Sequence, residues 1–84
     1  MSDYRLLVDW EVIETVNGFP VVLRRAIKDV LVRIGKHPDR MCDYVESHKR
    51  GLDLAVHLAK NYAIKYWIDF PDRHVKILEI VSAD

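Results

Sequence analysis

Four side chains near the end of the sequence have types and spacing that could do chemistry: His57, Lys65, Trp67 and Lys76. Histidine takes up and releases a proton near neutral pH. Lysines can hold the negative charge of a phosphate, and an indole can stack on a base or anchor a protein partner. Each has a simpler interpretation: His57 as a polar residue on a solvent-facing strand, the lysines as the charges that keep a sheet soluble, and Trp67 as packing under a loop.

Alternating apolar residues indicate the strands that must position these side chains. Strands are predicted over Asp53–Ala59, Tyr62–Phe70 and His74–Val81, joined by short turns at Lys60-Asn61 and Pro71-Asp72. Period-two spacing places one set of residues on the core face, namely Tyr62, Ile64, Tyr66 and Ile68. Ala63, Lys65 and Trp67 then lie on the other face, where we also expect His57, with Lys76 and His74 from the next strand.

The last strand is apolar on both faces, which indicates an interior strand. Before this meander the sequence predicts a strand over Tyr4–Trp10, a short helix over Glu11–Val16 capped by Asp9, and a long amphipathic helix over Pro20–Gly35. Residues 36–51 are expected to form a loop with a short helical turn near Tyr44. The fold class is therefore α+β: a twisted, mostly antiparallel four-stranded sheet with one short and one long helix packed on one face.

The composition limits what the protein can do. Its 84 residues predict a single domain, residues 1–84, and 13 basic residues balance 13 acidic ones, which disfavours strong binding to nucleic acid. The charges spread through MSDYRLLVDWEV lead us to expect no signal peptide, and no apolar run approaches the roughly 20 residues that cross a bilayer. We expect a soluble cytoplasmic protein without membrane partner or cofactor.

Residues that bind zinc in other proteins occur in the predicted loop, but their spacing does not match a structural zinc site. They are His37, Cys42 and His48, which are separated by five and six positions. Cys42 is the only cysteine, and no base can be assigned to it, so an inert thiol is predicted. We predict no metal site.

The order of elements and the hydrophobic pattern resemble the RelE/ParE superfamily of toxins from bacterial type II toxin-antitoxin systems. The likeness runs through YRLLVDW, VVLRRAIKDVLVRI, KHPDR and LDLAVHLAKNYAIKYWIDFPDRHVKILEIV, with YAIKY at the family's Tyr-Arg-aliphatic-aliphatic-Tyr core. Ribonucleases of the family cleave messenger RNA on the ribosome by 2′-hydroxyl attack, which requires proton transfer and cations near the phosphate. Here Ala63 stands at the arginine position of that core, and the chain ends VSAD where such enzymes carry basic or aromatic residues.

Two functions remain open under this resemblance. In the first, the chain is a toxin-like mRNA interferase (an endoribonuclease) with a degenerate site, in which His57 transfers the proton and Lys65 and Lys76 stabilise phosphate charge. Trp67, Arg73 and His74 would contribute to binding. In the second, it is a non-catalytic interaction module: a ParE-like gyrase-directed toxin, an inactive toxin relative or a self-associating protein. The implied partners are a cognate antitoxin, the ribosome with its messenger or DNA gyrase, and a second copy in a homodimer.

Overall fold

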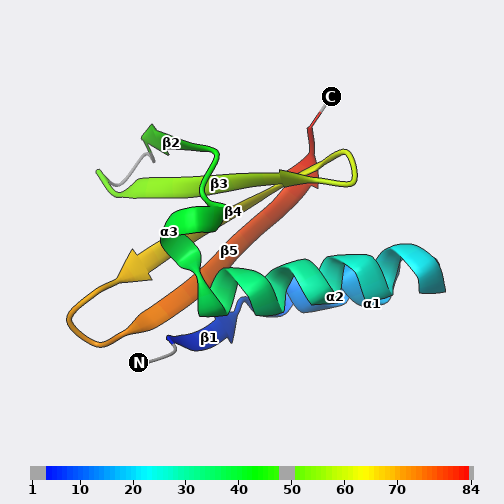
Figure 1. Cartoon of the computed structure of the whole chain (residues 1–84). Coiled ribbons are helices and arrows are strands. Elements are labelled where there is room, and N and C mark those ends of the chain that lie inside the picture. Colours follow the sequence, from blue (N-terminus) through cyan, green and yellow to red (C-terminus); the bar gives the residue numbers. More distant parts are fainter. Residues whose placement is uncertain (1–3, 48–50, 84) are drawn as a thin grey trace.

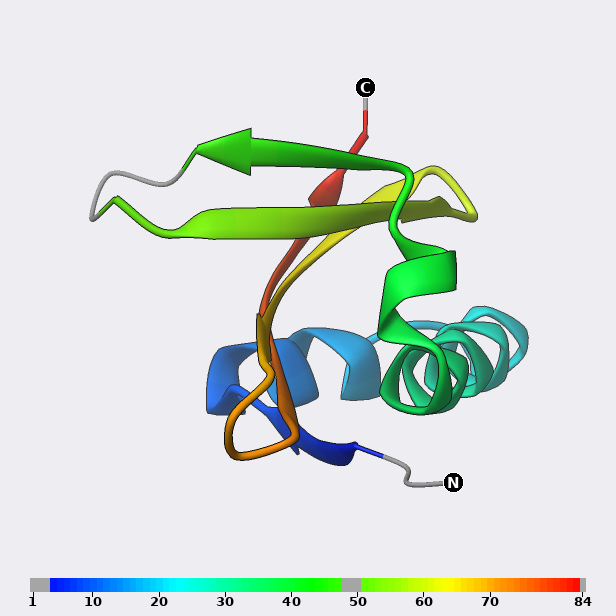
Figure 2. The same ribbon diagram turned by 60° about the vertical axis from the view of Figure 1, so that its left-hand side comes forward.

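One twisted sheet carries helices on one side (Figures 1 and 2). The computed structural model describes residues 4–47 and 51–83. In chain order the strands are β1 (Arg5–Val8), β2 (Tyr44–Ser47), β3 (Asp53–Ala59), β4 (Tyr62–Asp69) and β5 (His74–Ser82). They lie in the spatial order β1-β5-β4-β3-β2, with β1 parallel to β5 and every other pair antiparallel. The α+β class and the mostly antiparallel sheet are confirmed, but the sheet has five strands rather than four.

The additional strand comes from the segment that was predicted to be a loop. That segment instead forms α3 (Pro38–Met41) and then β2, so Tyr44 begins a strand rather than a helical turn. Three of the four β2 residues are exposed, and their sequence YVES has little of the apolar alternation that reveals a strand. Pairing with β3, in the register Tyr44↔Val56 to Ser47↔Asp53, defines β2.

The N-terminal elements follow the sequence prediction closely, with one error. Asp9 caps α1 (Trp10–Asn17) as predicted, because its Oδ1 accepts a hydrogen bond of 3.0 Å from the backbone N–H of Glu11. The cap ends β1 at Val8, so Trp10 starts a helix instead of extending the strand. Trp10 is 69% exposed, and the prediction that the strand extends to Trp10 is wrong.

The long helix α2 (Val21–Lys36) is confirmed and supplies much of the core. Its apolar stripe packs against the sheet, and the residues it buries are Ile27, Val30, Leu31, Ile34 and Gly35. Opposite them in the core lie Ile64 and Tyr66 of β4 and Val75 and Ile77 of β5. Among the described residues no helix is both long enough and apolar enough to cross a membrane.

A bulge in β5 explains why that strand reads as apolar on both faces. Lys65 pairs with Glu79, but the next residue of β4, Tyr66, pairs with Ile77, so Leu78 is an extra residue opposite the β4 chain. Ile77 and Ile80, three positions apart, are therefore both buried in the core. The prediction that this is an interior strand is confirmed, since β5 lies between β1 and β4.

Candidate functional site

The sheet face that carries no helix, which we call the open face, has Lys65 near its centre. The Lys65 Nζ donates a hydrogen bond of 2.9 Å to Glu46 Oε2 from β2, and it lies 3.7 Å from Glu79 Oε1 of β5. The hydrogen bond to Glu46 raises the pKa of Lys65, and the charges of Glu46 and Glu79 add to this effect against the opposing effect of burial. Lys65 is thus fully charged at neutral pH, and neighbouring carboxylates compensate its charge.

The other basic candidates on the open face and at its end lie against aromatic rings. Lys76 pairs with Trp67 across β4 and β5, and its Nζ lies 4.8 Å from the centroid of the indole. Arg73, in the turn between these strands, lies 4.5 Å from the centre of the Tyr4 ring. Lys65 and Lys76 do not pair with each other across the strands: Lys65 stands opposite Glu79, and Lys76 opposite Trp67. Both side chains nevertheless lie on the open face, each beside a different partner.

Ala63 lies on the same open face, between Leu58 of β3 and Val81 of β5. It is only 5% exposed. The position where the resemblance expects a cation is therefore a covered, apolar part of the sheet. The remaining open-face residues of β3, Leu54 and Val56, are buried as well and carry no polar side chain.

His57 lies on the opposite face from the one predicted. It pairs with Ile64, so its side chain shares the helix-covered face with Ile64 and Tyr66, while Lys65 pairs with Val56 on the open face. The expectation that His57, Lys65 and Trp67 share one face is wrong. The error arose because alternation sorts the residues of one strand into two sets. It does not show which set of the neighbouring strand lies on the same side of the sheet.

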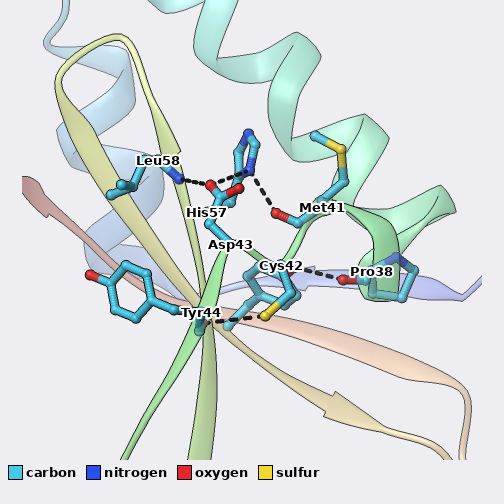
Figure 3. Close-up of polar contacts among 8 residues, drawn as sticks. Pro38, Met41, Cys42, Asp43, Tyr44, His57 and Leu58 are labelled. Carbon is cyan, nitrogen blue, oxygen red and sulfur yellow. Dashed lines mark hydrogen bonds and ion pairs between the residues drawn. The ribbon is translucent and has the colours of Figure 1, made fainter.

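The imidazole of His57 is held by two groups of the connection between α3 and β2 (Figure 3). Its Nδ1 lies 2.7 Å from the carbonyl oxygen of Met41 and 3.2 Å from Oδ2 of Asp43. Both are acceptors, so Nδ1 carries the hydrogen and Nε2 is the nitrogen left for a proton or a ligand. Asp43 Oδ2 also accepts a hydrogen bond of 2.8 Å from the backbone N–H of Leu58. A carboxylate that orients an imidazole in this way is a common arrangement for proton transfer.

Asp43 was missed at the sequence level, and no local signal could have revealed it. It lies in an irregular stretch, 14 positions before His57 in the sequence. The register between β2 and β3 alone brings the two side chains together. The neighbouring Glu46 escaped notice for the same reason.

Two further polar contacts fix the same connection to the sheet. The Tyr66 hydroxyl, on a fully buried side chain, donates a hydrogen bond of 2.7 Å to the carbonyl oxygen of Pro38, and burial raises the pKa of this tyrosine. The Cys42 thiol lies 3.2 Å from the carbonyl oxygen of Tyr44 and donates to it. Cys42 is only partly buried, and the structure gives it a hydrogen bond rather than a basic partner.

Metal-ligating side chains meet at one turn. Ligand atoms of Asp69, Asp72 and His74, at the turn between β4 and β5, lie within 4.8 Å of one another. The position of Asp69 is explained by the turn itself, since its Oδ1 accepts a hydrogen bond of 3.3 Å from the backbone N–H of Asp72. In the predicted loop, His37 and Cys42 are not part of any such group of described residues, and His48 lies outside the described residues.

Comparison of the fold with solved structures identifies RelE toxins. The chain is similar to an archaeal RelE–RelB complex from Pyrococcus horikoshii, with a TM-score of 0.78 and 19% identity over 98% of this chain and 97% of that chain. It is similar to the RelBE2 toxin-antitoxin complex from Mycobacterium tuberculosis, with a TM-score of 0.72 and 18% identity over 96% and 99% of the two chains. A mutant of the E. coli toxin RelE in the free state gives a TM-score of 0.70 and 15% identity over 99% and 86%.

The chain thus has the RelE fold, and the resemblance predicted from the sequence is confirmed at the level of the fold. No family model and no curated protein matches the sequence. Because a fold hosts many functions, the chemistry has to be argued from the sites described above.

Proposed function

We propose that the chain is the toxin-like member of a toxin-antitoxin pair and that it acts by binding a protein target rather than by cleaving RNA on its open face. Its fold and the antitoxin-bound state of two similar structures support the first part. One observation carries the second part: Lys65 is engaged by Glu46 and Glu79 on the face where Ala63 replaces a cation.

The charges explain why this face is a poor site for phosphate chemistry. Around the centre of this face, Lys65 and Lys76 supply two positive charges and Glu46 and Glu79 supply two negative ones, so these four charges cancel. An RNA phosphate approaching Lys65 would have to displace a carboxylate that is already hydrogen-bonded to it. Removal of one preorganised donor from such a site typically costs about 10²- to 10³-fold in rate, and here the donor expected at position 63 is missing as well.

The test is cleavage of messenger RNA on programmed ribosomes, with a RelE toxin as the positive control. We expect the messenger to stay intact with the wild type, and ribosome binding to be weak with a shallow dependence on salt. The double variant Glu46→Gln/Glu79→Gln serves as the matched control, because it leaves the backbone unchanged and exposes the Lys65 charge. It should bind RNA more tightly and with a steeper salt dependence. Cleavage by the wild type that is lost in Lys65→Met would contradict the proposal.

A second candidate function, RNA cleavage with His57 as the proton acceptor, is favoured by one specific observation. Asp43 and Met41 both accept from Nδ1, which leaves Nε2 as the basic nitrogen of the neutral ring, the form a general base needs. Cleavage that disappears in His57→Gln and persists in Lys65→Met would establish this function in place of the first. His37→Gln, at an exposed histidine that caps α3 by its backbone, is the control for nonspecific loss.

The antitoxin is the partner that the proposal requires. Expression of the chain alone should arrest growth, and coexpression of a small protein encoded beside it should restore growth and copurify with it. Normal growth under strong expression of a folded chain would contradict the toxin-like role.

A further inference from the structure

A pocket beside α3, at the end of the sheet near β2, combines apolar walls with carboxylates that have no basic neighbour in its lining. The open face and the His57 site lack this combination. The volume of the pocket is about 450 Å³, and its floor is formed by Ala55 of β3 and Ile68 of β4. Val45 of β2 and Phe70, which follows β4, also line it. These two side chains are 61% and 56% exposed.

The register explains why a hollow forms here. Val45 pairs with Ala55, and Ala55 pairs with Tyr66, so these residues share the helix-covered face with Ile68. The one-turn helix α3 covers this end of the sheet from Pro38 to Met41, and Asp39 lies at the pocket. Because the floor residue Ala55 has the smallest apolar side chain, the space above it stays unfilled.

Two carboxylates line this otherwise apolar pocket. Asp39 comes from α3 and Asp53 from the start of β3, and both residues are exposed. Neither forms an ion pair with another residue of the described parts of the chain, and no described lysine or arginine lines the pocket. By contrast, the other carboxylates at the sheet surface near here, Asp43 and Glu46, each face a basic group.

We propose that this pocket binds a lysine or arginine side chain of a protein partner. The apolar stem of such a side chain fits over Ala55 and Ile68, and its charged head reaches the carboxylates at Asp39 and Asp53. Phe70, which lines the pocket and is 56% exposed, supplies aromatic surface against which a guanidinium or ammonium group is attracted. The two carboxylates repel an anionic side chain, and a neutral amide can donate a hydrogen bond to them but lacks the charge that pairs with them.

The surroundings favour a protein as the source of the cation. Besides Val45 and Phe70, Leu52, which precedes the lining residue Asp53, is exposed as well. Apolar residues gathered around one pocket are typical of protein-binding surfaces, where a buried arginine or aromatic anchor supplies much of the affinity. The pocket also lies beside β2, which is the edge strand of the sheet, so an extended partner segment can reach it.

The pocket is a binding surface beyond those of the proposed function. Only the identity of the partner rests on the proposed function. The direct test therefore uses blocked tripeptides and the whole chain, followed by NMR chemical shifts of backbone amides. Ac-Ala-Arg-Ala-NH₂ and its lysine counterpart should give saturable shifts centred on Ala55, Trp67 and Ile68. The glutamine and glutamate counterparts should give none.

The variants separate the pocket from general surface charge. Asp39→Asn/Asp53→Asn should weaken binding of the arginine peptide by roughly 2- to 20-fold at low salt, the range for two exposed charge pairs. Glu14→Gln/Asp29→Asn removes the same charge from α1 and α2, helices that do not line the pocket, and should leave binding unchanged. Equal shifts with the glutamine peptide, equal loss in both double variants, or shifts that centre elsewhere would overturn the proposal. These outcomes do not depend on whether the chain is toxic or cleaves RNA.

Discussion

Two consecutive residues of β4, Lys65 and Tyr66, show how differently the two faces of this sheet use polar groups. On the open face, Lys65 is satisfied by side-chain carboxylates of β2 and β5, so the charges compensate one another. On the covered face, Tyr66 and its neighbour His57 bond to backbone carbonyls of Pro38 and Met41. The open face therefore uses its polar groups to neutralise charge, and the covered face uses them to hold the α3–β2 connection in place.

The difference shows why fold and activity can be separated in this protein. The polar groups of the open face do not hold the helices, so they can change without loss of the helix–sheet contacts. The polar groups of the covered face are part of the structure and also include the His57 imidazole, which Asp43 and Met41 orient. Each prediction below tests one side of this comparison.

The largest effect is expected at Tyr66 on the covered face. Tyr66→Ala removes a fully buried ring and should lower the free energy of unfolding by about 3–5 kcal/mol, a large part of the stability of a domain of this size. Tyr66→Phe keeps the ring and leaves the Pro38 carbonyl without its partner, which should cost about 1–3 kcal/mol. Urea denaturation measures both. Equal losses in the two variants would mean that packing of the ring contributes nothing.

Alkaline pH should destabilise the fold through one titrating group on each face. Burial raises the pKa of Tyr66, so the folded protein keeps this proton at a pH where the unfolded chain, with a pKa of about 10, has lost it. The stabilisation is present below about pH 10 and is lost as pH rises above it. Lys65, whose pKa is also raised, loses its contribution above about pH 10.4. Denaturation midpoints between pH 9 and 12 should therefore fall less steeply in Tyr66→Phe, and also in Lys65→Met, than in the wild type.

The next effect is expected at Asp43. Asp43→Ala leaves the Leu58 N–H without its acceptor and removes the carboxylate beside His57, which should lower stability by about 1–2 kcal/mol. Asp43→Asn keeps an oxygen for Leu58 and should cost less. Nitrogen chemical shifts of the imidazole should still report a hydrogen on Nδ1 in Asp43→Asn, because the Met41 carbonyl remains. A hydrogen on Nε2 in the neutral wild type would contradict the assigned orientation.

Loss of the open-face cation should have a moderate effect. Lys65→Met leaves Glu46 and Glu79 without their shared partner and should destabilise the fold by about 1 kcal/mol, since Glu79 is half exposed and solvent screens its charge. Restoring neutrality with Glu46→Gln in the same chain should recover part of the loss. A Lys65→Met variant that is as destabilised as Tyr66→Ala would remove the distinction between the faces.

The smallest effect is expected at an ion pair that belongs to neither face. Asp29 and Arg33 on α2 are 3.8 Å apart, and their side chains are 74% and 64% exposed. Asp29→Asn should change stability by less than about 0.5 kcal/mol. This variant is the reference for the urea measurements. A loss of 1 kcal/mol or more would mean that an exposed ion pair contributes as much stability as the Lys65 cluster of the open face.

Much of the fold follows from local patterns. The stripe of α2, the cap at Asp9 and the alternation in β4 each involve residues within a few positions of one another, and all three were predicted. The left-handed backbone at Lys60 and Asn61 agrees with the predicted hairpin turn. The strand β2 and the helix α3 were not predicted, because their residues are mostly polar and become regular only through contact with β3 and the end of α2.

The candidate sites depended on the tertiary structure to a greater degree. The sequence by itself determined which residue types are available and, through Ala63 and the balanced charge, that a cationic phosphate site is poorly provided for. Only the tertiary structure decided that His57 faces the helices, that Asp43 orients it, and that Glu46 and Glu79 engage Lys65. The physical reason is strand register: side chains alternate with a period of two, so the pairing of one strand with the next assigns every polar group to a face and to its partners.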